Sequence, residues 1–131
     1  MTIGWTIKEV NEWLENCTKY RGLDECWEEA TDRFGIWTYS LSYGSCFELR
    51  DRVEEYLRKR GIAESMIIKC TDIFWGIPEA EIKYDEEVYD LLIEALDYIS
   101  KTNEHFRYRA SALAELIRNA KKLKSNIICS G

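Results

Sequence analysis

The sequence predicts a mainly α-helical, single-domain protein over residues 1–131, a bundle of about five or six helices with room for a short β-hairpin. Three observations predict this class. Apolar residues recur every three to four positions in five segments, glycine rather than proline separates those segments, and 46% of the 131 residues are hydrophobic. A chain of this length buries about two-thirds of its unfolded surface, which is enough for one core.

Two helices are predicted in the N-terminal quarter of the chain. Thr6 and Glu9 have the spacing of a capping box, in which each side chain accepts a hydrogen bond from the other residue's backbone N–H. The first helix is therefore expected to begin at this pair. The second helix spans 24–34, and its periodicity is expected to turn Leu23 and Trp27 toward the core.

Three longer helices are predicted in the rest of the chain. Ser45 and Glu48 form a second capping box, which opens a helix that ends at Gly61. The next helix spans 85–101 and has an acidic first turn, and the last spans 103–124 and ends in lysines. The helix macrodipole favours acidic residues in a first turn and basic residues in a last turn, so both arrangements support these helices.

Two stretches do not follow the helical period. Residues 36–43 alternate with a period of two, which predicts a β-strand. One side holds Trp37, Tyr39, Leu41 and Tyr43, and the other holds Ile36, Thr38, Ser40 and Ser42. Residues 66–75 are apolar nearly all round. They fit a buried helix over 63–75, which is favoured, or a strand that turns at Pro78 and continues into 80–84.

The five cysteines predict reduced, buried thiols rather than disulfides or a metal site. Their number is odd, no pair has the two-to-four-residue spacing of zinc ligands, and His105 is the single histidine. No uninterrupted apolar run is long enough to span a bilayer, and the first residues lack a secretory signal pattern. A cytoplasmic location without membrane attachment is expected. The cysteines are Cys17, Cys26, Cys46, Cys70 and Cys129.

The net charge of −6 is distributed unevenly. Residues 1–100 hold 22 acids and 11 bases, whereas residues 101–131 hold two acids and seven bases. A double-stranded nucleic acid would be repelled by most of this surface, while a basic protein would be attracted. The composition therefore favours a basic protein as partner, and self-association stays open.

Carboxylates at helical spacing suggest a possible Mg²⁺ site. Glu28, Glu29 and Asp32 form E-E-x-x-D, and Glu48 and Asp51 form E-x-x-D. This pattern resembles the MazG-type all-α nucleotide pyrophosphohydrolases, with Asp32 standing where that family places a glutamate. The resemblance implies a Mg²⁺ ion held by the five carboxylates from two helices and acting on a pyrophosphate. The other interpretation is that both are solvated acidic helix faces.

The aromatic residues Trp37, Tyr39 and Tyr43, with Trp75, suggest a binding surface. Tyrosine and tryptophan give a large, rigid contact area with a polar tip, so they are frequent in interface hot spots and can stack on a nucleobase. The other interpretation is that one side of the predicted strand packs into the core.

Arg107 and Arg109 suggest a site for a phosphorylated ligand, because the guanidinium fork matches phosphate geometry. The other interpretation is that the basic C-terminal helix, with Arg118, pairs with the acids of residues 79–97.

These patterns together favour a non-enzymatic binding or inhibitory protein over an enzyme. The single histidine allows no credible Ser-His-Asp or Cys-His set, and phosphate-binding glycine loops are missing. We expect a chain that sequesters a basic protein or a small phosphorylated ligand without a cofactor, on the scheme of antitoxins, immunity proteins and counter-defence proteins. The alternative is the Mg²⁺-dependent pyrophosphohydrolase.

Overall fold

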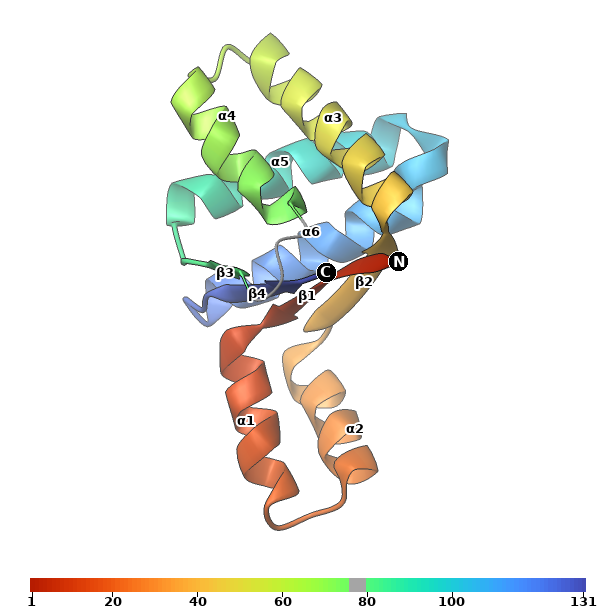
Figure 1. Cartoon of the computed structure of the whole chain (residues 1–131), viewed down its shortest axis with the longest axis vertical. Coiled ribbons are helices and arrows are strands. Elements are labelled where there is room, and N and C mark those ends of the chain that lie inside the picture. The colour runs from red at the N-terminus through yellow and green to blue at the C-terminus, as the bar shows by residue number, and fades with distance from the viewer. Residues whose placement is uncertain (76–79) are drawn as a thin grey trace.

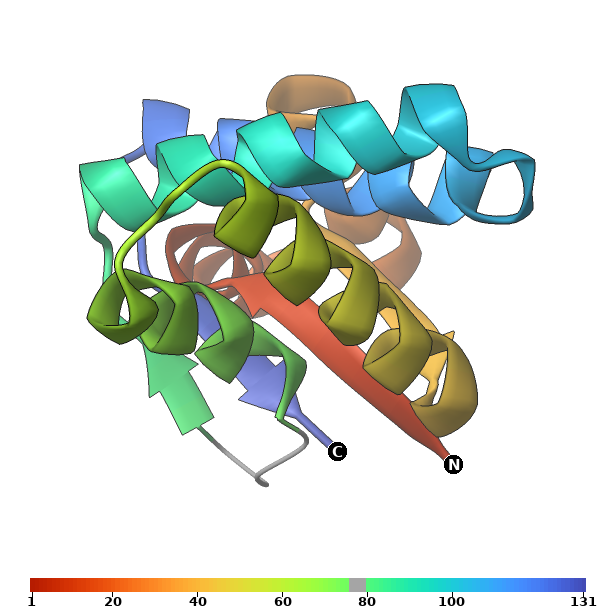
Figure 2. The same cartoon turned by 90° about the horizontal axis from the view of Figure 1, so that it is seen from above.

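The structure is a computed structural model that describes residues 1–75 and 80–131. In these residues six α-helices accompany a four-stranded antiparallel sheet, which confirms the mainly α class (Figure 1). Four helices lie against one face of the sheet, and the other two form a hairpin that projects from the strand ends (Figures 1 and 2).

The sheet joins both ends of the chain. Its order is β2-β1-β4-β3, so the first and last strands are neighbours in the middle. Trp5 is paired with Tyr39 on one side and Cys129 on the other. The strands are β1 (Thr2–Ile7), β2 (Thr38–Ser42), β3 (Ala80–Ile82) and β4 (Ile127–Ser130).

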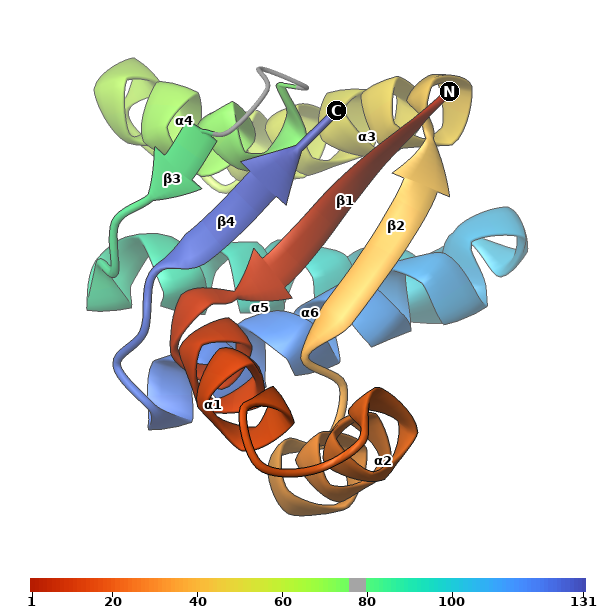
Figure 3. The same cartoon turned by 60° about the horizontal axis from the view of Figure 1, so that its bottom comes forward.

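The helices occupy two regions of the molecule. The covering helices α3 to α6 lie behind the sheet in Figure 3, whereas α1 and α2 project in front, beyond the strand ends. Short 3-10 turns follow α4 and precede α6. The helices are α1 (Lys8–Thr18), α2 (Leu23–Phe34), α3 (Tyr43–Lys59), α4 (Glu64–Thr71), α5 (Glu86–Thr102) and α6 (Arg107–Lys122), with turns η1 (Asp72–Phe74) and η2 (Glu104–Phe106).

The sheet is apolar on the helix side and polar on the open side. Ile3, Trp5 and Ile7 of β1 are fully buried, whereas the intervening Gly4 and Thr6 are partly accessible. The Trp5 indole Nε1–H donates a 2.7 Å hydrogen bond to the carbonyl of Ile73. This bond satisfies the one polar group of a large buried side chain and ties β1 to the turn after α4.

Most predicted elements are confirmed. The helices over 24–34, 85–101 and 103–124 correspond to α2, α5 and α6, and the strand within 36–43 is β2. The favoured helix over 63–75 is confirmed and consists of α4 followed by η1. Of the alternative strand, predicted to continue into 80–84, only Ala80–Ile82 is a strand among the described residues. The predicted turn at Pro78 lies outside the described residues.

Both predicted capping boxes are wrong. Thr6 lies in β1, where its hydroxyl is 3.1 Å from that of Thr38, and the N–H of Glu9 instead donates to Ser125 Oγ. The alternating burial along β1 extends this segment as a strand to Ile7, so α1 begins one residue later. The third helix begins two residues before Ser45, because Ser42 accepts from the N–H of Ser45 and acts as the cap.

The cysteine prediction is correct for three residues and wrong for two. Cys46, Cys70 and Cys129 are buried free thiols. Cys17 and Cys26 form a disulfide instead. The chain reverses direction between α1 and α2, which brings their Cα atoms to 5.9 Å although nine positions separate them.

Candidate functional site

The predicted aromatic surface does not form one continuous row. Trp37 is only 3% exposed, whereas Tyr39 and Tyr43 are partly buried. Trp37 precedes β2 and Tyr43 follows it, so the two lie about 20 Å apart along the chain. Burial raises the pKa of Tyr39, and the charge of Arg109 opposes that rise. These residues therefore belong to two different ends of the strand.

Tyr43 and Trp75 are linked through residues that the sequence did not single out. The Tyr43 and Phe47 rings lie 5.9 Å apart. The Arg50 guanidinium carbon lies 5.2 Å from the centroid of Phe47 and 4.7 Å from that of Trp75. This cation–π contact holds Trp75, which is 49% exposed, against Arg50. We call Tyr43, Phe47, Arg50 and Trp75 the Arg50 stack. Tyr43, Phe47 and Arg50 are four and three positions apart, and this helical spacing is the sequence signal that could have predicted their contact.

The C-terminal bases pair only partly with the acidic region. Arg118 forms an ion pair with Asp97, and Lys121 lies 2.6 Å from Asp90, so α5 and α6 are held together by charge. Arg107 is exposed at the start of α6, and Arg109 donates to the carbonyl of His105 at 3.1 Å. Neither of these two arginines meets a carboxylate among the described residues.

The predicted carboxylate ligands are not brought together. Glu28, Glu29 and Asp32 lie on the projecting α2, and Glu48 and Asp51 lie on α3, at the opposite end of the molecule in Figure 1. Within residues 1–75 and 80–131, no group of three or more histidine, cysteine, aspartate or glutamate side chains could hold a metal ion. These two sets therefore cannot form the single Mg²⁺ site that the MazG resemblance implies.

The hairpin of α1 and α2 is held together by its own contacts. The Cys17–Cys26 disulfide joins the two helices near the turn between them. At the other end the rings of Trp13 and Phe34 meet edge to face at 5.7 Å, and the Arg33 guanidinium lies 5.3 Å from the Phe34 centroid. A helical hairpin fixed at both ends is a rigid support for a binding surface.

Large apolar side chains are exposed on this hairpin. Tyr20 in the turn is 88% exposed, Leu23 is 60% exposed and Trp27 is 46% exposed. The prediction that Leu23 and Trp27 face the core is wrong, because Cys26 and Ala30 fill the narrow seam between the two helices. Trp27 instead packs one side on the buried Trp37, with ring centroids 4.6 Å apart.

Carboxylates border the exposed apolar residues. Asp24 precedes Trp27 by three positions and Glu28 follows Asp24 by four, so both lie on adjacent rows of α2. Neither forms an ion pair in the part of the chain that the structure describes. We call Leu23, Asp24, Trp27 and Glu28 the hairpin surface.

Arg21 does not neutralise the hairpin surface. Its guanidinium lies 2.7 Å from Glu29 and 3.4 Å from Glu25, and it lines the same shallow hollow as Glu28 without forming an ion pair with it in the described residues. The hydrogen bond to Glu29 raises the pKa of Arg21. Arg21 is therefore paired with Glu25 and Glu29 rather than with Asp24 or Glu28.

Comparison with known proteins supplies no family for this chain. Neither family models nor the searches of curated proteins and solved structures yield a match. No helix within the described residues is long and apolar enough to cross a bilayer. The features that remain are a sheet-backed helical core, a rigid projecting hairpin and an acidic surface with an exposed tryptophan.

Proposed function

We propose that this chain is a non-enzymatic binding protein that captures a basic protein partner on the hairpin surface. The observation that carries the proposal is the exposed Leu23–Trp27 pair beside two carboxylates that form no ion pair within residues 1–75 and 80–131. Interface hot spots are enriched in tryptophan, and polar residues form the rim around them.

The basic character of the partner follows from charge. Asp24 and Glu28 stand in a chain of net charge −6, so a cationic surface is attracted and an acidic one is repelled. A second copy of this chain would place the same carboxylates against one another, which is unfavourable. The proposed role is sequestration, the scheme on which antitoxins and immunity proteins are built.

Capture from cell lysate with matched variants tests the proposal. Trp27→Ala and Glu28→Lys change the hairpin surface, and Trp75→Ala and Glu48→Lys are the controls. Trp75 is 49% exposed against 46% for Trp27, and Glu48 is exposed on α3. Mass spectrometry should identify a basic protein that both hairpin variants lose and both controls keep. Removal of a hot-spot tryptophan should weaken binding about 30-fold or more.

Two outcomes would contradict the proposal. The first is a partner lost with Trp75→Ala and retained with Trp27→Ala, which would place the interface at the Arg50 stack. The second is a dimer of the pure protein that Trp27→Ala turns into a monomer. Glu28→Lys leaves the packing of Trp27 on Trp37 in place, so its loss of capture cannot come from a loosened hairpin.

The compartment is part of the same proposal. We place the chain in the cytoplasm, where the three buried cysteines would remain thiols. Most cytosols would also reduce the Cys17–Cys26 disulfide. Acid quenching of fresh lysate followed by alkylation in denaturant, with and without prior reduction, should therefore label this pair in both cases, because denaturation exposes the buried Cys26. Protection from labelling before reduction would indicate an oxidising compartment.

A further inference from the structure

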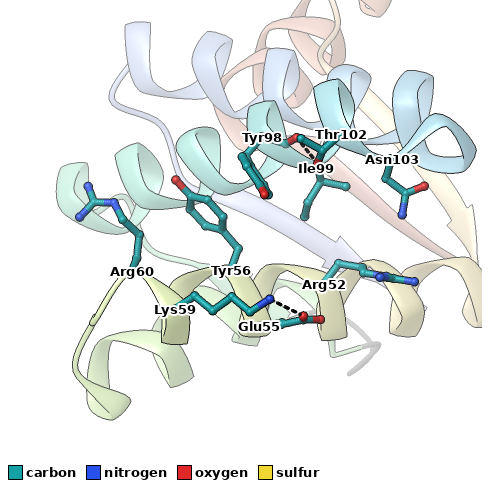
Figure 4. Close-up of a pocket in the computed structure, with 9 residues that line it drawn as sticks. All are labelled: Arg52, Glu55, Tyr56, Lys59, Arg60, Tyr98, Ile99, Thr102 and Asn103. Carbon is teal, nitrogen blue, oxygen red and sulfur yellow. Dashed lines mark hydrogen bonds and ion pairs between the residues drawn. The ribbon is translucent and has the colours of Figure 1, made fainter.

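A cavity of about 450 Å³ lies between α3 and α5, on the helical side of the sheet (Figure 4). None of the residues of the hairpin surface or of the Arg50 stack line it. Its volume is within the range of small-molecule sites, about 300–1,000 Å³. Figure 4 shows side chains of α3 along one side of the cavity and residues from the end of α5 along the other.

The cavity is basic within an acidic protein. Arg52, Lys59 and Arg60 line it together with one carboxylate, that of Glu55. The chain as a whole carries a charge of −6, so this local excess of positive charge runs against the overall balance. A small anion would be attracted here more than to other parts of the surface.

The three bases differ in how far they are already neutralised. Arg60 donates two hydrogen bonds to Glu94, at 2.8 and 2.9 Å. Lys59 lies 3.0 Å from Glu55 in an exposed pair. Arg52 forms no ion pair within residues 1–75 and 80–131. Its guanidinium is therefore the principal group that an incoming phosphate would meet, because it is not committed to a described carboxylate.

Two tyrosines give the cavity an aromatic wall. The rings of Tyr56 and Tyr98 lie 4.7 Å apart at an angle of 35°. The Tyr56 hydroxyl bonds to Glu94 at 3.0 Å, which holds its ring in place, while half of Tyr98 is exposed to solvent. A planar ring can stack on the accessible part of Tyr98. Asn103 also lines the cavity. Its Oδ1 accepts from the N–H of Phe106 at 3.3 Å, which leaves its amide N–H groups as donors for a ring edge.

We infer that this cavity binds a small molecule with an aromatic ring and a phosphate, of the mononucleotide class. Tyr98 stacks on the ring and Arg52 binds the phosphate. The site is separate from the hairpin surface and does not depend on the proposed partner. A nucleic-acid strand is a poorer fit, because α5 carries the acids Glu86, Glu87 and Asp90 along its exposed side and would repel a polyanion.

Calorimetric titration of the full chain tests the inference. The probes are the four 5′-mononucleotides, adenosine, inorganic phosphate and a ten-nucleotide single strand. At least one mononucleotide should bind, with adenosine and phosphate each at least tenfold weaker. The single strand should bind no more tightly than the mononucleotide.

Matched variants locate the site. Arg52→Ala and Tyr98→Ala should each weaken mononucleotide binding about tenfold, equal to about 1.4 kcal/mol. Arg107→Ala and Tyr108→Ala remove the same side-chain types from exposed positions of α6 and should leave the affinity unchanged. Tyr98→Phe retains the stacking ring and should bind like the original chain.

Four results would overturn the inference. They are no binding of any mononucleotide at millimolar concentration, phosphate binding as tight as the mononucleotide, tighter binding of the single strand, and an affinity that Arg52→Ala leaves unchanged. Thermal melting of each variant checks that it is folded, and all four positions are on the surface, so folding should be retained.

Discussion

Trp27 and Trp37 pack on one another but differ in their exposure to solvent. Trp37 is buried, and its Nε1–H lies 3.4 Å from Thr31 Oγ1. Trp27 covers it and exposes its other side. The sequence pattern predicted Trp27 in the core and left Trp37 either on a surface or in the core, whereas the structure buries Trp37 and leaves Trp27 46% exposed. Periodicity finds the apolar positions of a helix, yet only the partner element decides which of them are covered.

The three free cysteines are predicted to be unreactive in the folded protein. Burial raises the pKa of Cys46 to about 12 and those of Cys70 and Cys129 to about 11. At pH 9 the thiolate, which is the reactive form, is therefore scarce in the native state. Alkylation without reductant should proceed at least about 100-fold more slowly for the native protein than in denaturant, where three thiols react.

The same pKa values predict how stability depends on pH. The unfolded chain ionises these thiols from about pH 9, whereas the folded chain holds them protonated. Their contribution is complete below pH 9 and is lost as the pH rises toward 11 and 12. Denaturant titrations should show a falling free energy of unfolding across this range. Rapid native labelling at pH 9, or stability that rises with pH there, would contradict the burial of these residues.

Glu94 is predicted to limit anion binding in the α3–α5 cavity. Its hydrogen bonds with Arg60 lower the pKa of the Glu94 carboxyl. The carboxylate therefore stays charged at neutral pH and remains bonded to the Arg60 guanidinium, which is then not free to bind an anion. Glu94→Gln removes that charge and retains an acceptor for Tyr56. Mononucleotide affinity should rise about three- to tenfold, measured by calorimetry.

Glu64→Gln is the matched control for that substitution. It removes one of the two carboxylates paired with Arg58, at 2.8 Å, while Glu54 remains at 2.7 Å, and Arg58 does not line the cavity. Its affinity should equal that of the original chain. An increase with both variants would mean that net charge alone, and not Arg60, sets the affinity.

At the scale of elements, the α1–α2 hairpin is the least integrated part of the fold. It joins the sheet through the ends of β1 and β2, and the first turn of α1 is also held by the Lys8–Glu81 pair at 2.7 Å and by the Glu9 N–H, which donates to Ser125 Oγ. Its outer half depends on its own seam and on the disulfide. Removing the disulfide by Cys17→Ser with Cys26→Ser should therefore act locally. The free energy of opening the hairpin should fall by about 2–3 kcal/mol, as expected for a short closed loop.

Hydrogen exchange with peptide-level readout measures this effect. Amides of residues 8–34 should exchange faster in the double variant, whereas those of α5 should not change. Uniform acceleration over the whole chain would show that the hairpin unfolds only together with the core. Unchanged exchange would show that the Trp13–Phe34 contact suffices.

The long helices were predictable from sequence and the sheet was largely not. Segments such as α5 carry their own signal, with Asp85 as a cap that accepts from the N–H of Val88 and an unbroken apolar stripe. By contrast, β1 and β4 are each four to six residues long and pair over more than a hundred positions. Local patterns do not encode such pairing, and the capping-box spacing of Thr6 and Glu9 indicates a helix start at the residues where β1 ends.

For the whole molecule, the sheet explains where the candidate sites lie. The last residues of β1 pair with the first residues of β2. α1 follows β1 and α2 precedes β2, so the two helices project together as a hairpin. α2 precedes β2 and α3 follows it, so their carboxylates lie beyond opposite ends of this strand, which separates the MazG-like set. The hairpin surface and the basic cavity are thus on different parts of the molecule, the first on the projecting hairpin and the second on the helices that cover the sheet.

The most direct test is the hydrogen-exchange footprint of the complex with the captured basic partner. Exchange is compared for the free chain and the complex at equal concentration and pH. We predict protection concentrated in residues 19–32, with the peptides of α5 and of the open sheet face unchanged. Protection of residues 85–94 or of β1 and β2, with 19–32 exchanging as in the free chain, would contradict the hairpin as the binding surface.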